Sequence, residues 1–462
     1  MRTSEAAFVF CFDLIGRNYE KIKNLPENNF LILFFLLFSL AFLIASLVAL
    51  DRAFLFEGME QILTQPCKIP TNYFAVGGYS ATFFNMGLVT LACLGLYLIF
   101  RAELNNVATL AIMLTVGFAS WGIDILNIWP TVFGTMLYCV VKKRTMKNYV
   151  SAMLFTTGIA PLISDLLTRY PYETTVGFTP QGAVLAIVVG LVSGFFIPAG
   201  LTHAPNVHKG YNLYNAALPV GMGAFILQAI LFTTLGVKLP GAPAAEALKV
   251  ASRSGANLFC CVLFGLAIVA ALAMGCTPKA YWGFISNKKR NMSITAGFGN
   301  DMFLMNFGVF GLFILGYYNL VGANFNGITF GILFCMLATC NSGSNPATVW
   351  PILLGYVAAS YLFRGVSALT GGQFAQAINA QAILVGLCYA NGLSPITAKY
   401  GWQYGFGAAV VHYCLVTTVP SLHGGFCLYN GGFTAALTCI LVVPQLERFA
   451  RTKLQRLEAK KR

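Results

Sequence analysis

The feature that most constrains this chain is a succession of apolar runs, many of them close to the length needed to cross a lipid bilayer. Hydrophobic residues make up 57% of the 462 residues, and Asp, Glu, Lys and Arg together only 10%. A soluble domain carries about 25% charged residues. So few charges cannot cover a water-exposed surface, so most of the outer surface must face lipid. The sequence therefore predicts an all-α, polytopic integral membrane protein.

Hydropathy predicts about fourteen membrane segments, about seven in each half of the chain. The first half contains segments at 30–50, 81–100, 107–120, 128–141, 149–166, 183–201 and 216–237. The second half contains segments at 258–276, 302–321, 328–340, 347–363, 374–389, 401–420 and 432–443. Several are shorter than the roughly 20 residues of a full crossing, which predicts that some are half-helices or re-entrant segments.

Basic residues lie between the apolar runs, so the formal net charge of +14 indicates membrane topology rather than binding to nucleic acid. Short cytoplasmic loops of membrane proteins are rich in Lys and Arg. One continuous assignment puts the N-terminal segment, the loops 142–147 and 279–290 and the basic tail on the cytoplasmic side. We therefore expect a multi-pass protein of the inner (plasma) membrane with both termini cytoplasmic, in contact with the lipid bilayer. A homo-oligomer is compatible with the sequence.

The strongest signal is self-similarity between the two halves. Residues 75–134 align with residues 296–355 without a gap, and about fourteen of roughly sixty positions are identical. Asn85 matches Asn306, and Gly122 matches Gly343. Such order-preserving agreement predicts an internal repeat.

Two further blocks extend the repeat. The segment Gly-Ile-Ala-Pro at 158–161 resembles Gly-Leu-Ser-Pro at 392–395. The segment 208–215, His-Lys-Gly-Tyr-Asn-Leu-Tyr-Asn, matches 423–430, His-Gly-Gly-Phe-Cys-Leu-Tyr-Asn. We refer to these two eight-residue segments as the first and second Tyr-Asn blocks.

The repeat divides the chain into five parts. These are a cytoplasmic N-terminal segment (1–28), a first membrane repeat (29–237), an inter-repeat loop (238–256), a second membrane repeat (257–444) and a basic cytoplasmic tail (445–462). An odd number of crossings, about seven per repeat, makes the second copy enter the membrane in the opposite orientation. We therefore predict two inverted-topology repeats, with the loop near Ala244 outside. A parallel duplication would need an even number of crossings.

Each repeat has a helix break at the same point. Gly and Pro interrupt the apolar pattern around 120–130 and 341–351, and polar residues lie beside the freed backbone. Paired interruptions of this kind are the best sequence indication of a transport site, because half-helix ends and freed carbonyls bind solutes and ions. The candidate substrate-binding residues here are Asp124, Asn127, Asn341, Ser344, Asn345 and Thr348. The alternative is an ordinary loop with helix caps.

The Tyr-Asn blocks form the second candidate constellation. Each precedes a new apolar segment, and an Asn with a Tyr can recognise a carbonyl or amide through neutral hydrogen bonds. The candidate residues are His208, Tyr214, Asn215, His423, Tyr429 and Asn430. The alternative is again a helix cap with packing glycines.

Other chemistry finds little support in the sequence. His203 and His208 have no third ligand at a useful spacing, so no metal site is expected. The 13 cysteines form no CxxC pair. No nucleophile constellation is present, so we expect no catalytic residues, no enzyme activity and no cofactor, with coupling to Na⁺ or H⁺ left open.

The whole chain resembles an uncharacterised bacterial multispanning membrane family, catalogued only as a domain of unknown function. Residues 210–221 also resemble a segment of urea transporters, Gly-Leu-[Tyr/Phe]-Gly-[Tyr/Phe]-Asn-x-x-Leu-x-Gly. Urea transporters also have two inverted halves, so this local resemblance implies a small-solute channel or carrier. Their Asn-Asn-Pro signature is not reproduced after Asn85 or Asn105, and the halves here are longer.

These observations predict a secondary-carrier-like transporter that moves a small polar neutral or anionic solute through a midplane site between the repeats. A passive channel for a small neutral solute is the alternative, and an intramembrane enzyme is a third class. A reporter near Ala244 tests the orientation of the repeats.

Overall fold

The computed structural model describes residues 19–65, 71–170, 177–236, 254–286, 293–372 and 376–461. These residues form helices joined by turns, and no β-strand occurs among them. The predicted inter-repeat loop, Ala244 included, lies outside the described residues apart from its last three positions, which begin a helix at Ser254.

The first half contains both long and short helices. They are α2 (Glu27–Val48), α3 (Leu55–Thr64), α4 (Tyr73–Val76), α5 (Gly78–Ile99), α6 (Asn106–Phe118), α7 (Trp129–Val141), α8 (Val150–Thr156), α9 (Ala160–Arg169), α10 (Pro180–Leu201), α11 (Ala204–His208) and α12 (Ala217–Leu235). Short 3₁₀ turns lie at Arg52–Phe54, Met146–Tyr149 and Thr157–Ile159.

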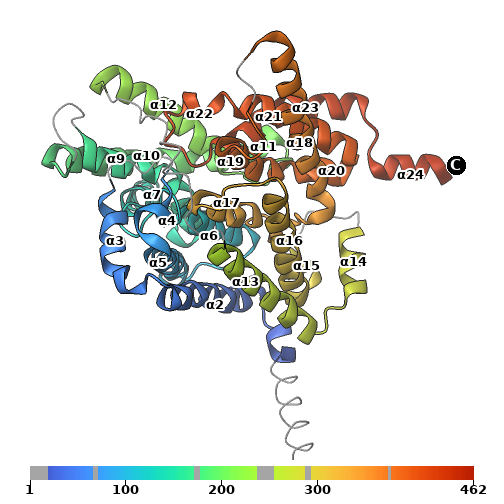
Figure 1. Cartoon of the computed structure of the whole chain (residues 1–462), viewed down its shortest axis with the longest axis horizontal. Helices are drawn as coiled ribbons and strands as arrows, with labels where there is room; N and C mark the ends of the chain where they lie inside the picture. Colours follow the sequence, from blue (N-terminus) through green and yellow to red (C-terminus); the bar gives the residue numbers. More distant parts are fainter. Residues whose placement is uncertain are drawn as a thin grey trace, which may run out of the picture.

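The second half repeats this order of long and short helices. They are α13 (Ser254–Ala273), α14 (Pro278–Ser286), α15 (Ile294–Phe298), α16 (Asn300–Leu320), α17 (Gly327–Leu337), α18 (Pro346–Thr370), α19 (Gln381–Ala390), α20 (Ser394–Tyr400), α21 (Trp402–Val416), α22 (Val419–Leu422) and α23 (Asn430–Phe449). The tail then forms α24 (Lys453–Lys461), which extends away from the bundle in Figure 1.

Nine helices in the described part of the chain are long and apolar enough to cross a membrane. They are α2, α5, the run Met146–Arg169, α10, α12, α13, α16, α18 and the run Asn430–Ala459. The other predicted segments fall on the shorter helices α6, α7, α17, α19 and α21. The chain is thus an all-α, multi-pass membrane protein, and most of its short predicted segments are short helices, whereas 432–443 lies within α23.

Equivalent helices pair in the two halves. In the first half α2 packs on α5, and α7 packs on α10. In the second half α13 packs on α16, and α18 packs on α21. The halves are interleaved, with α13 beside α2 and α5 in Figure 1. Phe42 on α2 stacks on Phe259 on α13, with ring centroids 5.1 Å apart.

The centre of the molecule is the contact between α6 and α17, one helix from each half. Every residue of α17, and every residue of α6 from Ala108 onward, is buried. Apolar side chains surround both helices, and a helix that is hydrophobic on all sides is buried in protein or lipid. Here it is buried in protein, because the longer helices surround it.

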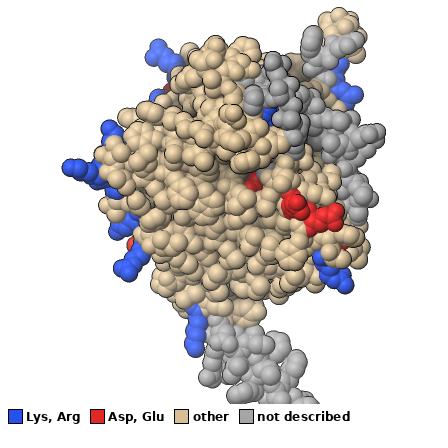
Figure 2. All heavy atoms as spheres, turned by 90° about the vertical axis from the view of Figure 1, so that its left-hand side faces the viewer, with Lys and Arg blue, Asp and Glu red and all other residues tan. Residues whose placement is uncertain are grey.

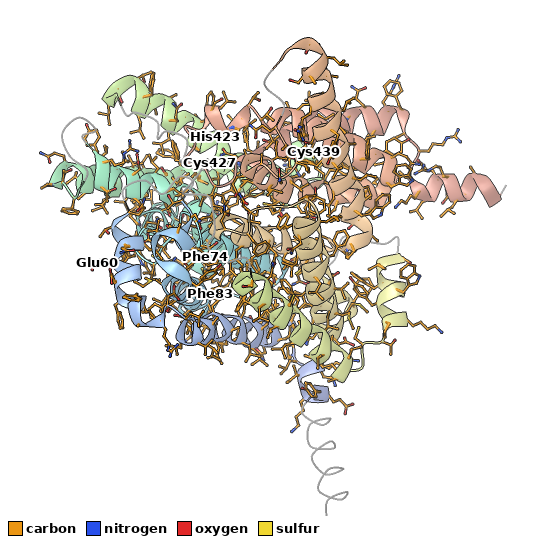
Figure 3. The ribbon with its side chains drawn as sticks, in the orientation of Figure 1. Glu60, Phe74, Phe83, His423, Cys427 and Cys439 are labelled. Atoms are coloured by element: carbon orange, nitrogen blue, oxygen red, sulfur yellow. The ribbon has the colours of Figure 1, made fainter. Side chains whose placement is uncertain are left out.

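An aromatic cluster fills the space between α5, α13 and α17. The ring centroid of Phe83 lies 5.0 Å from that of Phe259 and 5.6 Å from that of Phe330. Phe74 and Phe83, whose rings are 5.8 Å apart, lie in this region in Figure 3, whereas Glu60 on α3 points outward. Within this cluster, the two halves contact each other through aromatic side chains.

The outer surface is apolar, as a bilayer requires. Leu98, Phe196, Phe232 and Leu266, all on the long helices, are more than half exposed. Figure 2 shows one face of the molecule, where a broad area is almost free of charged side chains; Lys and Arg lie mostly around its margins, and a few Asp and Glu lie to its right. The membrane-spanning helices therefore contact the lipid bilayer through this apolar surface.

Candidate functional site

Both halves contain the helix break that the sequence predicts. The first break separates α6 from α7 at residues 119–128, and the second separates α17 from α18 at residues 338–345. Gly122 and Gly343 occupy equivalent places in the two breaks, with φ of 133° and 101°. Residues that carry a Cβ atom rarely adopt such a positive φ, so these two positions require glycine.

One asparagine in each half holds the break through the same hydrogen bonds. Asn85 on α5 donates from Nδ2 to the carbonyls of Ala119 (2.8 Å) and Ile123 (3.0 Å). Its counterpart Asn306 on α16 donates to the carbonyls of Cys340 (3.1 Å) and Ser344 (2.9 Å). Carbonyls freed by a broken helix in an apolar interior need such partners.

The first break is closed by its own polar side chains. Asp124, only 1% exposed, accepts from the backbone N–H groups of Leu126 (2.8 Å) and Asn127 (3.0 Å). Asn127 accepts from the N–H of Asp124 (3.0 Å) and donates to the hydroxyl of Ser164 on α9 (3.0 Å). This arrangement attaches the first break to α9.

The second break is capped in a similar way. Asn345 and Thr348 form a reciprocal capping box at the start of α18, each accepting from the backbone N–H of the other. Ser344 bonds to the hydroxyl of Ser394 on α20 at 3.1 Å. Asn341 accepts from the N–H of Thr295 at 3.1 Å and donates to the hydroxyl of Thr109 on α6 at 3.2 Å.

Each Tyr-Asn block forms a backbone hydrogen bond with the other half of the chain. The N–H of Leu213, in the first block, donates to the carbonyl of Gly392 in the second half (3.0 Å). The N–H of Leu428, in the second block, donates to the carbonyl of Gly158 in the first half (2.8 Å). Leu213 and Leu428 are equivalent positions, so each block is bound to the Gly-x-x-Pro turn of the other half.

The tyrosines of the two blocks are buried in the interior. Tyr214 donates its hydroxyl proton toward the carbonyls of Cys335 (3.0 Å) and Cys388 (3.1 Å). Tyr429 packs edge-on against Phe118 with ring centroids 5.4 Å apart. Both side chains therefore connect the blocks to the central helices.

A pocket of about 490 Å³ lies where the first Tyr-Asn block meets the second break. This volume suits a small solute. Its walls come from the start of α6, the first block, the second break, α20 and the tail: Asn106, Val107, Leu110, Lys209, Gly210, Tyr211, Leu213, Asn215, Ser342, Gly343, Thr348, Ser394, Pro395, Ala398, Lys399, Thr452, Lys453 and Leu454.

The charged groups around the pocket are basic. Lys209, Lys399 and Lys453 line it, and no Asp or Glu does so among the described residues. The ammonium of Lys399 donates to the Tyr211 hydroxyl at 2.5 Å, and that hydroxyl lies 3.3 Å from the hydroxyl of Tyr400. Burial raises the pKa of both phenols, that of Tyr400 to about 12, so both remain neutral at pH 7.

The His-Asn pair differs between the two blocks. His423 donates from Nδ1 to the side-chain oxygen of Asn430. In the first block, both ring nitrogens of His208 are without a partner among the described residues, although the side chain is 1% exposed. Asn215, the counterpart of Asn430, lines the pocket instead.

The structure brings only part of the predicted site residues together. Asn215 and Thr348 line the pocket, and Ser344 touches its wall through Ser394. The remaining candidates do not line this pocket: Asp124, Asn127, His208, Tyr214, Asn341, Asn345, His423, Tyr429 and Asn430. Figure 3 shows His423 in the upper part of the molecule, near Cys427.

The candidates expected from the sequence did not include four residues that line the pocket, Lys209, Tyr211, Lys399 and Lys453. A signal for Lys399 was present, because it is the only Asp, Glu, Lys or Arg between Arg364 and Glu447. A single charge in so long an apolar stretch is costly in a membrane and marks a functional position by default.

Comparisons with known proteins place the chain without supplying a substrate. No curated protein matches, and no solved structure matches. The resemblance of residues 210–221 to urea transporters therefore rests on the local sequence alone. One family matches residues 52–233 and 291–448, which include the two helix breaks, both Tyr-Asn blocks and Lys399. The chain thus belongs to the family described as "Protein of unknown function (DUF1576)".

Proposed function

We propose that the chain is a secondary carrier, which moves a small polar neutral or anionic solute through a site near the middle of the membrane. The observation that carries this proposal is the pocket beside the second break, where Asn215 from one half faces Thr348 and Ser394 from the other. A site between two halves of a membrane protein can open to either side when the halves move.

We further propose that the halves are inverted-topology repeats. Equivalent asparagines hold equivalent carbonyls, and the two blocks exchange equivalent hydrogen bonds across the centre. Reciprocal contacts of this kind are what a two-fold axis between the halves produces. About seven segments in each half, an odd number, favours an axis in the membrane plane. The positive-inside rule then favours a plasma membrane with both termini in the cytoplasm.

A transport cycle follows if the two halves exchange conformations. In the described state the pocket opens beside Asn215, whose half has the unpaired His208, while His423 and Asn430 are paired in the other half. In the opposite state Asn215 would pair with His208, and Asn430 would turn toward a pocket at the first break. Each asparagine thus alternates between a histidine and the solute.

Two other functions predict different behaviour. A passive channel for a small neutral solute would not need Asn215 to alternate, and its flux would not saturate readily. An intramembrane enzyme would change the solute chemically.

The test is transport by the full chain in proteoliposomes. Phosphate, acetate, succinate, urea and glycerol are supplied as labelled solutes, with and without gradients of Na⁺ and H⁺. A carrier gives saturable uptake and counterflow of at least one solute in unchanged form. Unsaturable flux without counterflow supports the channel, and absence of movement for the whole panel counts against transport of small solutes.

A further inference from the structure

The structure assigns an anion-binding role to the pocket: Lys399, Lys209 and Lys453 line the mouth of a site for a small carboxylate or phosphate group. This inference rests on the proposed carrier function and narrows its substrate class. The three lysines come from α20, the first Tyr-Asn block and the tail, so only the tertiary structure gathers them around one opening.

The charged side chains that line the opening are all basic among the described residues. Lys209 forms an ion pair with Glu447 at 2.5 Å, which offsets its charge. No carboxylate pairs with Lys399 among the described residues; its ammonium contacts the neutral Tyr211. An opening lined by one sign of charge raises the local concentration of solutes of the opposite sign.

The ammonium of Lys399 is held in place by two buried tyrosines. Its ammonium lies 5.1 Å from the ring centroid of Tyr211 and 5.4 Å from that of Tyr400. Both rings are buried, at 5% and 2% exposure, whereas the lysine itself is exposed. A charge fixed in this way loses little further conformational freedom on binding an anion.

The floor of the pocket suits the oxygens of an anion. Ser394 supplies a hydroxyl, and the amide of Asn215 forms no hydrogen bond to the described residues. The hydroxyl of Thr348 lines the pocket too, but it donates its proton to the carbonyl of Asn345 at 3.0 Å. An ammonium at the mouth with neutral donors deeper in the pocket is an arrangement that binds a carboxylate or phosphate group.

The charge is specific to the second half and is not required by the repeat. In the alignment of the two Gly-x-x-Pro turns, Lys399 corresponds to Asp165. Asp165 forms an ion pair with Arg169 at 2.8 Å, one turn farther along α9. The equivalent position is thus acidic and paired within its own helix. The fold does not need a cation there, which favours a functional reason for Lys399.

The experiment measures the melting temperature of the full chain in neutral detergent, because a ligand that binds only the folded state raises it. The probes are phosphate, acetate and succinate at constant ionic strength, with urea and glycerol as neutral probes. At least one anion is expected to raise the melting temperature of the wild type and of Lys399→Arg. The rise is expected to be lost in Lys399→Gln and retained in Lys142→Gln, a control at an exposed lysine outside the pocket.

A second arm separates a soluble anion from a lipid headgroup, which offers the same phosphate chemistry. The proteins are compared in nanodiscs with and without phosphatidylglycerol. A rise with phosphatidylglycerol alone, lost in Lys399→Gln, identifies a headgroup site and overturns the solute assignment. Equal rises in wild type and Lys399→Gln, or rises with urea or glycerol only, or no rise with any probe, also overturn it.

The flux assay separates this inference from the proposed function. Saturable transport of a neutral solute, with Lys399→Gln unaffected, would leave a carrier and remove the anion site. Anion binding that depends on Lys399, without flux of any anion, would leave the site and remove the carrier.

Discussion

At the residue scale, two side chains of the same type have different roles in the two halves. Asn430 accepts a hydrogen bond from Nδ1 of His423, and Asn215 lines a pocket while both ring nitrogens of its histidine, His208, are without a partner among the described residues. Sequence alone makes these positions equivalent. In the proposed cycle this difference belongs to the conformational state, and it leads to opposite expectations for the same substitution.

Asn430→Leu is expected to destabilise the fold, whereas Asn215→Leu is expected to abolish transport with little effect on stability. Leaving a buried polar group without its partner costs about 1–3 kcal/mol. Asn215 loses no hydrogen bond within the described structure. Thermal denaturation and solute flux of both variants check this. Equal loss of stability in the two would contradict the proposed difference, and normal flux in Asn215→Leu would remove this residue from the site.

His208 gives the molecule an acid sensitivity that can be measured. Burial lowers its pKa to about 4, below the value near 6.5 of an unfolded chain. Between these values the unfolded chain binds more protons than the folded one, so this histidine makes stability fall as pH decreases from 6.5 to 4. We expect His208→Phe to reduce the difference in melting temperature between pH 7 and pH 5. An unchanged difference would show that His208 is not buried as a neutral group.

At the element scale, the crossing of α6 and α17 depends on close backbone contact. A Cβ atom at Gly331 would lie 2.1 Å from the carbonyl oxygen of Gly117 and 2.4 Å from the hydroxyl of Ser120. Small residues allow helices to approach in this way. Gly316 on α16 makes no such close contact, because a Cβ atom there would meet nothing within 4 Å.

Gly331→Ala is therefore expected to lower the free energy of unfolding by about 1–3 kcal/mol, the usual cost of overpacking. Gly316→Ala is the matched control. It is expected to be neutral or to stabilise by up to about 1 kcal/mol, because alanine favours a helix over glycine. Denaturation of both variants in the same detergent measures the difference. If Gly331→Ala and Gly316→Ala have similar stability, the contact between α6 and α17 can accommodate a Cβ atom, which contradicts the expected overpacking.

At the scale of the whole molecule, the two breaks are related by the repeat but differ in access. Ser394 lines the pocket at the second break. Its counterpart Ala160, in the Gly-x-x-Pro turn of the first half, is fully buried. If the halves alternate, the buried position opens on the opposite side of the membrane in the other state.

Ser394→Cys and Ala160→Cys test this alternation, because both are small changes at equivalent positions. Cysteines that could react in the background are first replaced by serine: Cys261 and Cys414, which are exposed among the described residues, and Cys11 and Cys67, which lie outside them. We expect a membrane-impermeant thiol reagent to label Ser394→Cys from the cytoplasmic side and Ala160→Cys from the opposite side. A transported solute should change the two labelling rates in opposite directions. Labelling of both from one side would contradict the inverted exchange.

Much of the fold could be predicted from the sequence because its signals are local. Apolar runs predicted the helices, and glycine and proline marked both breaks. Most short runs fell on short helices, whereas the short run 432–443 lies within the longer α23. The repeat also predicted that Asn85 and Asn306 are equivalent, and they make the same hydrogen bonds.

The sequence by itself thus determined that the chain crosses the membrane repeatedly, where its helices break and which positions correspond. Only the tertiary structure decided that α6 and α17 lie at the centre, since protein interior and lipid are equally apolar to a hydrophobic helix. It also decided which candidates share the pocket. Lys209, Lys399 and Lys453 are far apart along the chain, and long-range packing alone brings them to one opening beside Asn215 and Thr348.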